Sequence, residues 1–130
     1  MFTKKTEKLE QQECDLEAQV RELSQELKSK YFKEKAKKLK DPDDYAMYNY
    51  LFIGGFHHLY LGNYKTFIIE LSLLLIALVL FGCGYPLGLL LIIAISIYEI
   101  PQLFMSQFIV RNKNLEISKK ILIEVNDNSK

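Results

Sequence analysis

The chain has 130 residues and a formal net charge of +1, so it is long enough for one small domain with terminal extensions. Its N-terminal part is nearly neutral overall, which argues against a nucleic-acid-binding protein. Two cysteines in very different settings, Cys14 and Cys83, exclude a disulfide framework.

The charged residues are strongly segregated along the chain. Residues 1–44 and 111–130 are rich in Lys and Glu, whereas residues 45–110 contain only Lys65, Glu70 and Glu99. This polar–apolar–polar pattern is typical of a small membrane protein with a soluble arm. The first 44 residues also lack the apolar core of a cleavable signal peptide.

Residues 1–40 are rich in Glu, Lys, Gln and Leu and contain no Gly or Pro, which predicts one long helical arm. Leu16, Val20, Leu23 and Leu27 are spaced by four, three and four residues, as in a heptad seam. The seam predicts that residues 9–31 bind a protein partner or a second copy of the chain. The alternative is a solvated, partly frayed helix.

The arm ends in a basic cluster that is expected to lie at the membrane surface. Anionic headgroups attract each such residue by about 1 kcal/mol, and the positive-inside rule places the cluster in the cytoplasm. The lysines of this basic cluster are Lys33, Lys35, Lys37, Lys38 and Lys40. Residues 41–44, with Pro42, are expected to break the helix, and Asp43 or Asp44 to cap the next one.

Residues 45–61 are aromatic and apolar but are interrupted by Asn49, two glycines and two histidines. The uninterrupted part is too short to cross a bilayer. Two interpretations remain, a short interfacial or re-entrant helix and a third, short span. The first agrees better with an even number of crossings.

Two long apolar runs predict membrane spans over residues 66–84 and 86–106, since a bilayer core needs about 20 apolar residues of helix. The uncharged Gly/Pro-rich break at residues 82–86 predicts a tight hairpin on the outer face. Both termini are then cytoplasmic. The tail, residues 111–130, gives both a ragged helical pattern and a broken alternation, and we expect a short amphipathic helix.

Glu70 and Glu99 are the clearest chemical signal, because a carboxylate in hydrocarbon is costly and faces a partner or water. At about 1.5 Å per residue, Glu70 lies roughly 6 Å and Glu99 roughly 10 Å from the inner boundary. His57 and His58 reach the same layer if their segment is re-entrant. This polar cluster of Glu70, Glu99, His57 and His58 forms either a proton- or cation-linked site or hydrogen bonds that lock the hairpin.

Chemical motifs are otherwise missing from the sequence. Two adjacent histidines with distant glutamates are a weak zinc signal, so no metal site is expected. No nucleophile–base pair, phosphate loop or dinucleotide fingerprint is recognisable, and we expect no cofactor and no enzymatic activity.

The stretches 51–64 and 89–114 resemble the TM-two domain family, a small domain with two transmembrane helices, and the resemblance covers roughly residues 48–112. His58 replaces the family's Arg, Leu59 replaces its Phe, Phe67 replaces a Gly, and no Trp precedes Glu99. The residues that match the family motif are Gly55, His57, Tyr60, Leu61, Gly62, Glu99 and Pro101.

The resemblance implies a two-span membrane domain of bacterial type, with its motif loop near one interface and a contact between His57 and Glu99. It implies no reaction. We therefore expect an all-α protein of the bacterial inner membrane that acts as a non-enzymatic anchor, scaffold or accessory subunit. The alternative is a small oligomeric channel or a proton- or cation-linked transport subunit that uses the polar cluster.

Overall fold

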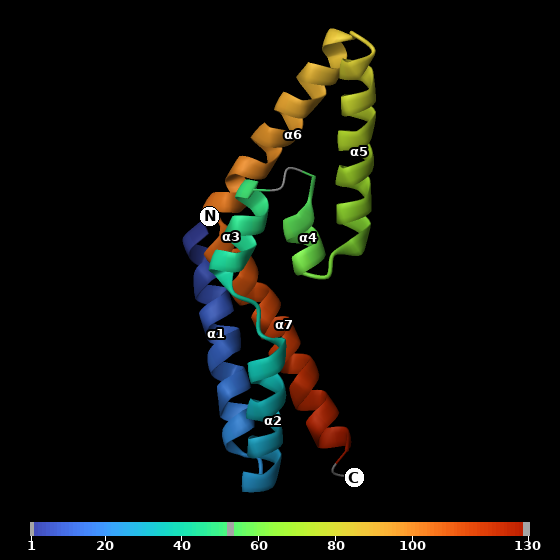
Figure 1. Cartoon of the computed structure of the whole chain (residues 1–130). Helices are drawn as coiled ribbons and strands as arrows, with labels where there is room; N and C mark the ends of the chain where they lie inside the picture. Colours follow the sequence, from blue (N-terminus) through green and yellow to red (C-terminus); the bar gives the residue numbers. More distant parts are fainter. Residues whose placement is uncertain (1, 52–53, 129–130) are drawn as a thin grey trace. The chain divides into compact units, whose positions relative to one another are not determined.

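The structure, a computed structural model, describes residues 2–51 and 54–128, and within these residues it contains helices and no strand (Figure 1). The chain divides into two compact units. Unit 1 comprises Met1–Lys40 and Arg111–Lys130, and unit 2 comprises Asp41–Val110. The helices are α1 (Phe2–Arg21), α2 (Gln25–Lys38), α3 (Pro42–Leu51), α4 (Phe56–Tyr60), α5 (Tyr64–Gly82), α6 (Pro86–Phe104) and α7 (Ser106–Asp127).

The prediction of one long N-terminal helix is wrong, because the arm is divided into α1 and α2 by a break at residues 22–24. The amides of Glu22 and Leu23 bond to carbonyls three residues earlier, at 3.3 Å each, which tightens and ends α1. The Ser24 side chain then accepts a hydrogen bond from the amide of Leu27 at 3.4 Å and caps α2. The turn between α1 and α2 therefore forms at a serine cap, although it contains no Gly or Pro.

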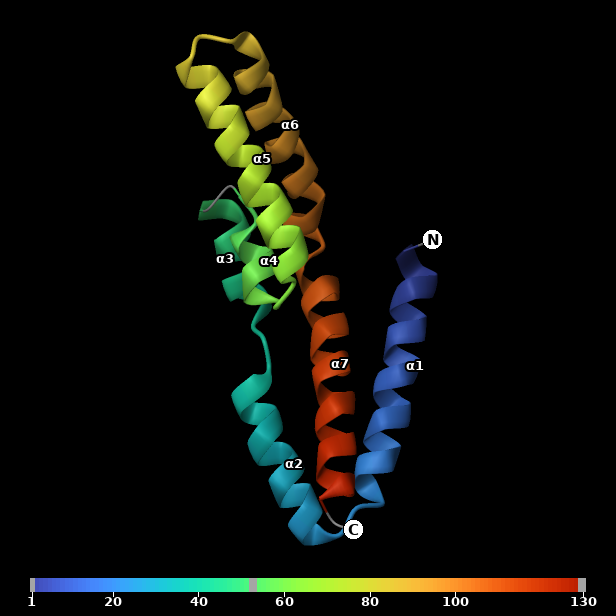
Figure 2. The ribbon, with the colours of Figure 1, turned by 90° about the vertical axis from the view of Figure 1, so that its right-hand side faces the viewer.

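Unit 1 is built from both ends of the chain, since α1, α2 and the greater part of α7 belong to it (Figure 2). The tail is helical as expected, but it is part of one 22-residue helix that begins at Ser106. Its apolar residues pack with those of the arm instead of forming a separate element. The buried apolar side chains of unit 1 are Leu9, Leu16, Val20, Tyr31, Leu115, Ile121, Leu122 and Val125.

Two helices of unit 2, α5 and α6, are long and apolar enough to cross a membrane by length and composition. Both ends of each helix lie within two residues of the ends of the predicted span. Only 11% of the apolar window of α5 and 17% of that of α6 is buried within the protein, so most of their apolar surface faces outward. Inside the helices, the hydroxyls of Ser72 and Ser96 donate to carbonyls four residues earlier at 2.7 and 3.0 Å.

The α5–α6 hairpin is packed most closely at Gly88. A Cβ at this position would meet the backbone nitrogen of Phe81 and would lie 2.5 Å from the carbonyl oxygen of Ala77, which is itself fully buried. Small residues allow the backbones of two membrane helices to approach each other closely. Gly88 and Ala77 therefore allow the two helices to lie side by side (Figures 1 and 2).

Residues 42–51 and 56–60 form two short helices, α3 and α4, of 10 and 5 residues. Each is shorter than the roughly 20 helical residues that a bilayer core needs. Pro42 begins α3, and the Asp41 side chain accepts a hydrogen bond from the amide of Asp43 at 2.7 Å. Asp41 therefore caps this helix in place of the expected Asp43 or Asp44.

Candidate functional site

The four residues of the polar cluster all lie buried in unit 2, on α4, α5 and α6. Their side chains are largely shielded: His57 is 0%, His58 9%, Glu70 6% and Glu99 4% exposed. The His57 and His58 rings are 4.2 Å apart, and Nε2 of His58 lies 3.2 Å from Oε1 of Glu70. The structure thus brings together the two histidines and Glu70, which the sequence separates by twelve residues.

Two glycines with left-handed backbone conformations shape this cluster. Gly54 has φ +121° and Gly55 has φ +83°, backbone angles that residues with a side chain rarely adopt. A Cβ on Gly55 would lie 2.5 Å from Oε2 of Glu70, so only glycine leaves room for that carboxylate. The amide of Gly54 donates to Oε1 of Glu99 at 3.3 Å. The Gly54-Gly55 turn therefore binds the Glu99 carboxylate through a backbone amide and leaves space for the Glu70 carboxylate.

His57 is held by Gln102 of α6, at 3.1 Å between Nε2 and Oε1. The hydroxyl of Tyr45 donates to the same oxygen at 3.5 Å, and the Tyr45 ring packs edge-on against His57. The contact between His57 and Glu99 that the resemblance implies is thus replaced by one with Gln102, three residues further along α6. Glu99 instead accepts from Gly54, and its carbonyl accepts from Asn49 at 3.5 Å.

Burial lowers the pKa of both histidines. Burial, and then the neighbouring His58, lower the pKa of His57 to about 4, although the Gln102 hydrogen bond acts in the opposite direction. Burial also lowers the pKa of His58. Both shifts favour the uncharged imidazole, which presents a lone pair. One potential ligand atom from each of His57, His58 and Glu70 lies within 4.8 Å of the others.

The remaining residues of the family motif have different surroundings in unit 2. Leu61 is buried with Tyr45 and Val110 in the apolar core of unit 2, with Tyr60 packed against them. The Tyr60 hydroxyl accepts from the amide of Asp41 at 2.8 Å and donates to Asp44 at 3.4 Å. Gly62 has φ +79°, as the turn before α5 requires, and Pro101 lies inside α6 on an exposed face.

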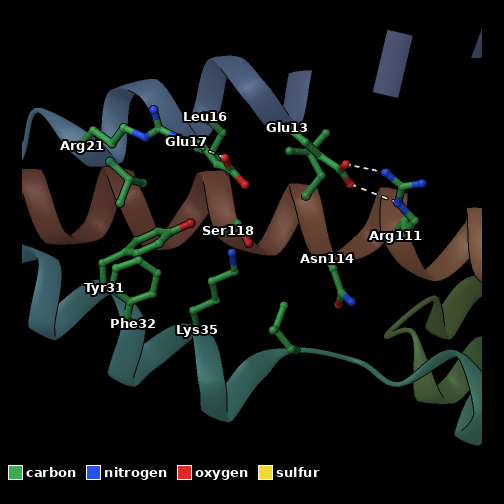
Figure 3. Close-up of a pocket in the computed structure, with 13 residues that line it drawn as sticks. Glu13, Leu16, Glu17, Arg21, Tyr31, Phe32, Lys35, Arg111, Asn114 and Ser118 are labelled. Atoms are coloured by element: carbon green, nitrogen blue, oxygen red, sulfur yellow. Dashed lines mark hydrogen bonds and ion pairs between the residues drawn. The ribbon is translucent and has the colours of Figure 1, made fainter. Parts of the chain in front are cut away.

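A second candidate site is a cleft of about 480 Å³ in unit 1, between α1 and α2 with α7 behind them (Figure 3). Its apolar lining includes Leu16 and Val20 of the predicted seam, both 6% exposed. Two other apolar side chains of the lining remain accessible, Phe32 of α2 at 55% and Leu39, directly after α2, at 42% exposed. Leu23 and Leu27 are half-buried and do not line it.

Charged side chains of both signs border this cleft. Glu13 of α1 binds Arg111 of α7 through two hydrogen bonds, one of them at 3.3 Å to Nε, as drawn in Figure 3. The bonds to Glu13 raise the pKa of Arg111. The side chain of Asn114 bonds to both backbone groups of Lys40 at 2.8 Å, which ties the end of the arm to α7.

The lysines of the basic cluster are engaged to different degrees within unit 1. Lys37 pairs with Glu34 at 3.2 Å, and Lys38 pairs with both Glu34 and Glu124, at 3.9 and 3.3 Å. Lys35 lies 5.7 Å from the centre of the Tyr31 ring, inside the cleft. These pairings are exposed, so they compete only weakly with anionic headgroups.

Sequence reasoning missed Gln102, Tyr45 and the pair of Glu13 with Arg111. Gln102 carried a signal, because it is a polar residue one helical turn from Glu99 in an otherwise apolar run. Glu13 was not among the predicted site residues, although it binds Arg111 of α7. No sequence pattern connects Tyr45 to His57.

No protein-family model, no curated protein and no solved structure matches the chain. The likeness to the TM-two domain family therefore rests on the motif residues alone.

Proposed function

We propose that the protein is a non-enzymatic membrane anchor or accessory subunit that recruits a second protein through unit 1. One observation carries the proposal: two helices with outward apolar surfaces belong to one unit, and the charged helices form another with its own core. Apolar surface of this extent is stable when lipid covers it. The likeness to the TM-two domain family is in keeping with such an anchor.

The proposal places both termini in the cytoplasm of a bacterial-type cell and the α5–α6 turn on the outer face. Unit 1 contains residues from both ends of the chain, which favours an even number of crossings. The lysines near the end of the arm favour the cytoplasmic side for that unit. The turn between α5 and α6 carries no charge, in agreement with translocation.

The cleft of unit 1 is the surface on which recruitment is proposed. Phe32 and Leu39 expose apolar area beside buried Leu16 and Val20, while acidic and basic groups border the lining. An amphipathic helix of a partner, with an apolar face between charges of both signs, fits these properties. This differs from a free coiled-coil seam, because Leu16 and Val20 already pack within unit 1.

Photocrosslinking in native membranes tests recruitment. A photoreactive phenylalanine analogue at Phe32, inside the cleft, is compared with the same analogue at Glu26, an exposed position of α2 outside the cleft. We expect position 32, and not position 26, to crosslink to one foreign protein that mass spectrometry identifies. Equal crosslinking at both positions, or none at position 32, would contradict the proposal, and crosslinks only to a second copy would replace it by self-assembly.

A second candidate function, a proton- or cation-linked transport subunit or small channel, is favoured by the buried polar cluster. Carboxylates and imidazoles inside or beside apolar spans are costly and mark ion pathways in membrane proteins. Ion flux into liposomes tests this function, with Glu70→Gln and Glu99→Gln as variants. Flux that is present in the wild type and lost in both variants would support it, and a wild-type protein that conducts nothing would exclude it.

A further inference from the structure

Three side chains of unit 2 converge as a set of metal ligands. His57 and His58 come from α4 and Glu70 from α5, and one ligand atom of each lies within 4.8 Å of the others. His57 and Glu70 are more than nine-tenths buried, and the His58 side chain is 11% exposed. The convergence is therefore enclosed by the protein and is not a chance grouping of mobile surface groups.

Most polar atoms of this group have no hydrogen-bond partner among the described residues. They are Nδ1 of His57, both ring nitrogens of His58 and both carboxylate oxygens of Glu70. Nε2 of His58 is 3.2 Å from Oε1 of Glu70, but their relative orientation does not make a hydrogen bond. Buried polar atoms are normally paired, so a set of unpaired ones on neighbouring side chains indicates a ligand.

Gln102 determines which nitrogen of His57 is free to bind. The Gln102 side-chain oxygen accepts the Tyr45 hydroxyl proton and lies 3.1 Å from Nε2 of His57, so that nitrogen carries a proton. The lone pair of the neutral imidazole is then on Nδ1, the unpaired atom. A hydrogen bond from the outer nitrogen is the usual way in which a protein orients a metal-binding histidine.

The charge of this region also favours a cation. Glu70 and Glu99 are its buried carboxylates, and Lys65, the one basic residue between 45 and 110, is exposed. Two ionised carboxylates in an apolar helical hairpin are costly without a counter-charge. A divalent ion bound beside Glu70 supplies such a counter-charge.

We propose that His57, His58 and Glu70 form a binding site for a divalent transition-metal ion, with zinc the best match and a fourth position left for water. Two imidazoles and one carboxylate suit zinc and its neighbours, whereas magnesium and calcium prefer all-oxygen sites. Ligand atoms around tetrahedral zinc are about 3.3 Å apart, given bonds of about 2.0 Å. The 3.2 Å between Nε2 of His58 and Oε1 of Glu70 is already close to this distance. The His57 ring is expected to move toward these two atoms when the metal binds.

The proposal goes beyond the anchoring function and does not depend on it. The test uses the full chain without a histidine tag, in detergent, with both exposed cysteines replaced (Cys14→Ser, Cys83→Ser) so that thiols do not bind metal. Cobalt(II) is the probe, because its visible absorption distinguishes a tetrahedral site from free ions. We expect one cobalt per chain, with tetrahedral bands that an equivalent of zinc removes.

Matched variants assign the ligands. Glu70→Gln keeps the size of the side chain and is expected to weaken cobalt binding by at least about 100-fold, and His58→Gln by a similar factor. Glu99→Gln makes the same change at a buried carboxylate outside the ligand set and should weaken binding less than about tenfold. Absence of tetrahedral bands in the wild type, or equal loss in Glu70→Gln and Glu99→Gln, would overturn the proposal. Helical content of each variant, measured by circular dichroism, shows that it is folded.

Discussion

Gly55 and Glu70 fit against each other so closely that a methyl group on the glycine would lie 2.5 Å from Oε2 of the carboxylate. Gly55→Ala is therefore expected to displace Glu70 and to strain the backbone, which has φ +83°. Overpacking of this kind costs about 1–3 kcal/mol, and the left-handed conformation adds about 1–2 kcal/mol. Unfolding in mixed detergent micelles measures the sum.

Gly62→Ala is the matched control for this prediction. Gly62 has nearly the same backbone angle, φ +79°, but nothing lies within 4 Å of the place of its Cβ. This variant should show only the backbone strain. Equal losses of unfolding free energy for the two variants would mean that Glu70 does not depend on the space at position 55.

A second prediction concerns the contact between α5 and α6. Gly88→Ala places a methyl group against the backbone of Phe81 and the carbonyl of Ala77, so the hairpin is expected to lose about 1–3 kcal/mol. Gly82→Ala, near the end of α5, meets nothing within 4 Å and should change stability by less than about 1 kcal/mol. Equal tolerance of alanine at both sites would show that the helices do not pack at Gly88.

A third prediction separates the two uses of the seam. Leu16→Ala should destabilise unit 1 by about 2–5 kcal/mol, because Leu16 is 6% exposed in its core. Leu27→Ala should cost less, since Leu27 is half-buried. Faster hydrogen exchange of α7 peptides in the full chain measures this loss of stability in unit 1. If Leu16→Ala leaves this exchange unchanged but dissociates an oligomer, the seam joins two chains instead of three helices.

A fourth prediction concerns acid pH. Hydrogen bonds from Lys120 and Lys113 lower the pKa of Glu116 below its ordinary value of 4.5. The unfolded chain then binds the proton more readily, so the contribution is present above pH 4.5 and lost as pH falls through the lowered pKa. The carboxylate is 48% exposed and screened by solvent, so the effect stays below about 1 kcal/mol.

Hydrogen exchange of α7 at pH 7 and pH 3 checks this prediction, with Glu116→Gln as the comparison. The wild type should be more protected than the variant at pH 7, and the two should agree at pH 3 after correction for intrinsic exchange rates. A difference that is the same at both pH values would assign the effect to packing and not to the ion pairs.

The apolar hairpin was predictable because composition and length suffice for it. The runs that include Glu70 and Glu99 are too apolar and too long for anything but helices of about 20 residues. The nearly equal depths of the two glutamates follow from the helical rise and from where each run begins. That arithmetic placed the two glutamates at similar depths without any knowledge of their contacts, and the histidines joined them only under the re-entrant interpretation.

The organisation of unit 1 was not predictable in the same way. The turn before Ser24 contains no Gly or Pro, and a single serine cap is a weaker signal than the helix propensity on either side. The pairing of Glu13 with Arg111 joins residues from opposite ends of the chain, and local pattern carries no information about it. The unpaired atoms of His58 and Glu70 likewise depend on ring orientation and on the Gly54-Gly55 turn.

Because unit 1 takes helices from both ends of the chain, the order of synthesis delays its completion. Helices α1 and α2 leave the ribosome before the hairpin, and residues 41–110 must follow before α7 can supply its apolar side chains. At about 5–20 residues per second this interval lasts roughly 4–14 s. During it Leu16, Val20 and Tyr31 lack the α7 part of their core, so the nascent arm keeps apolar surface exposed until α7 follows.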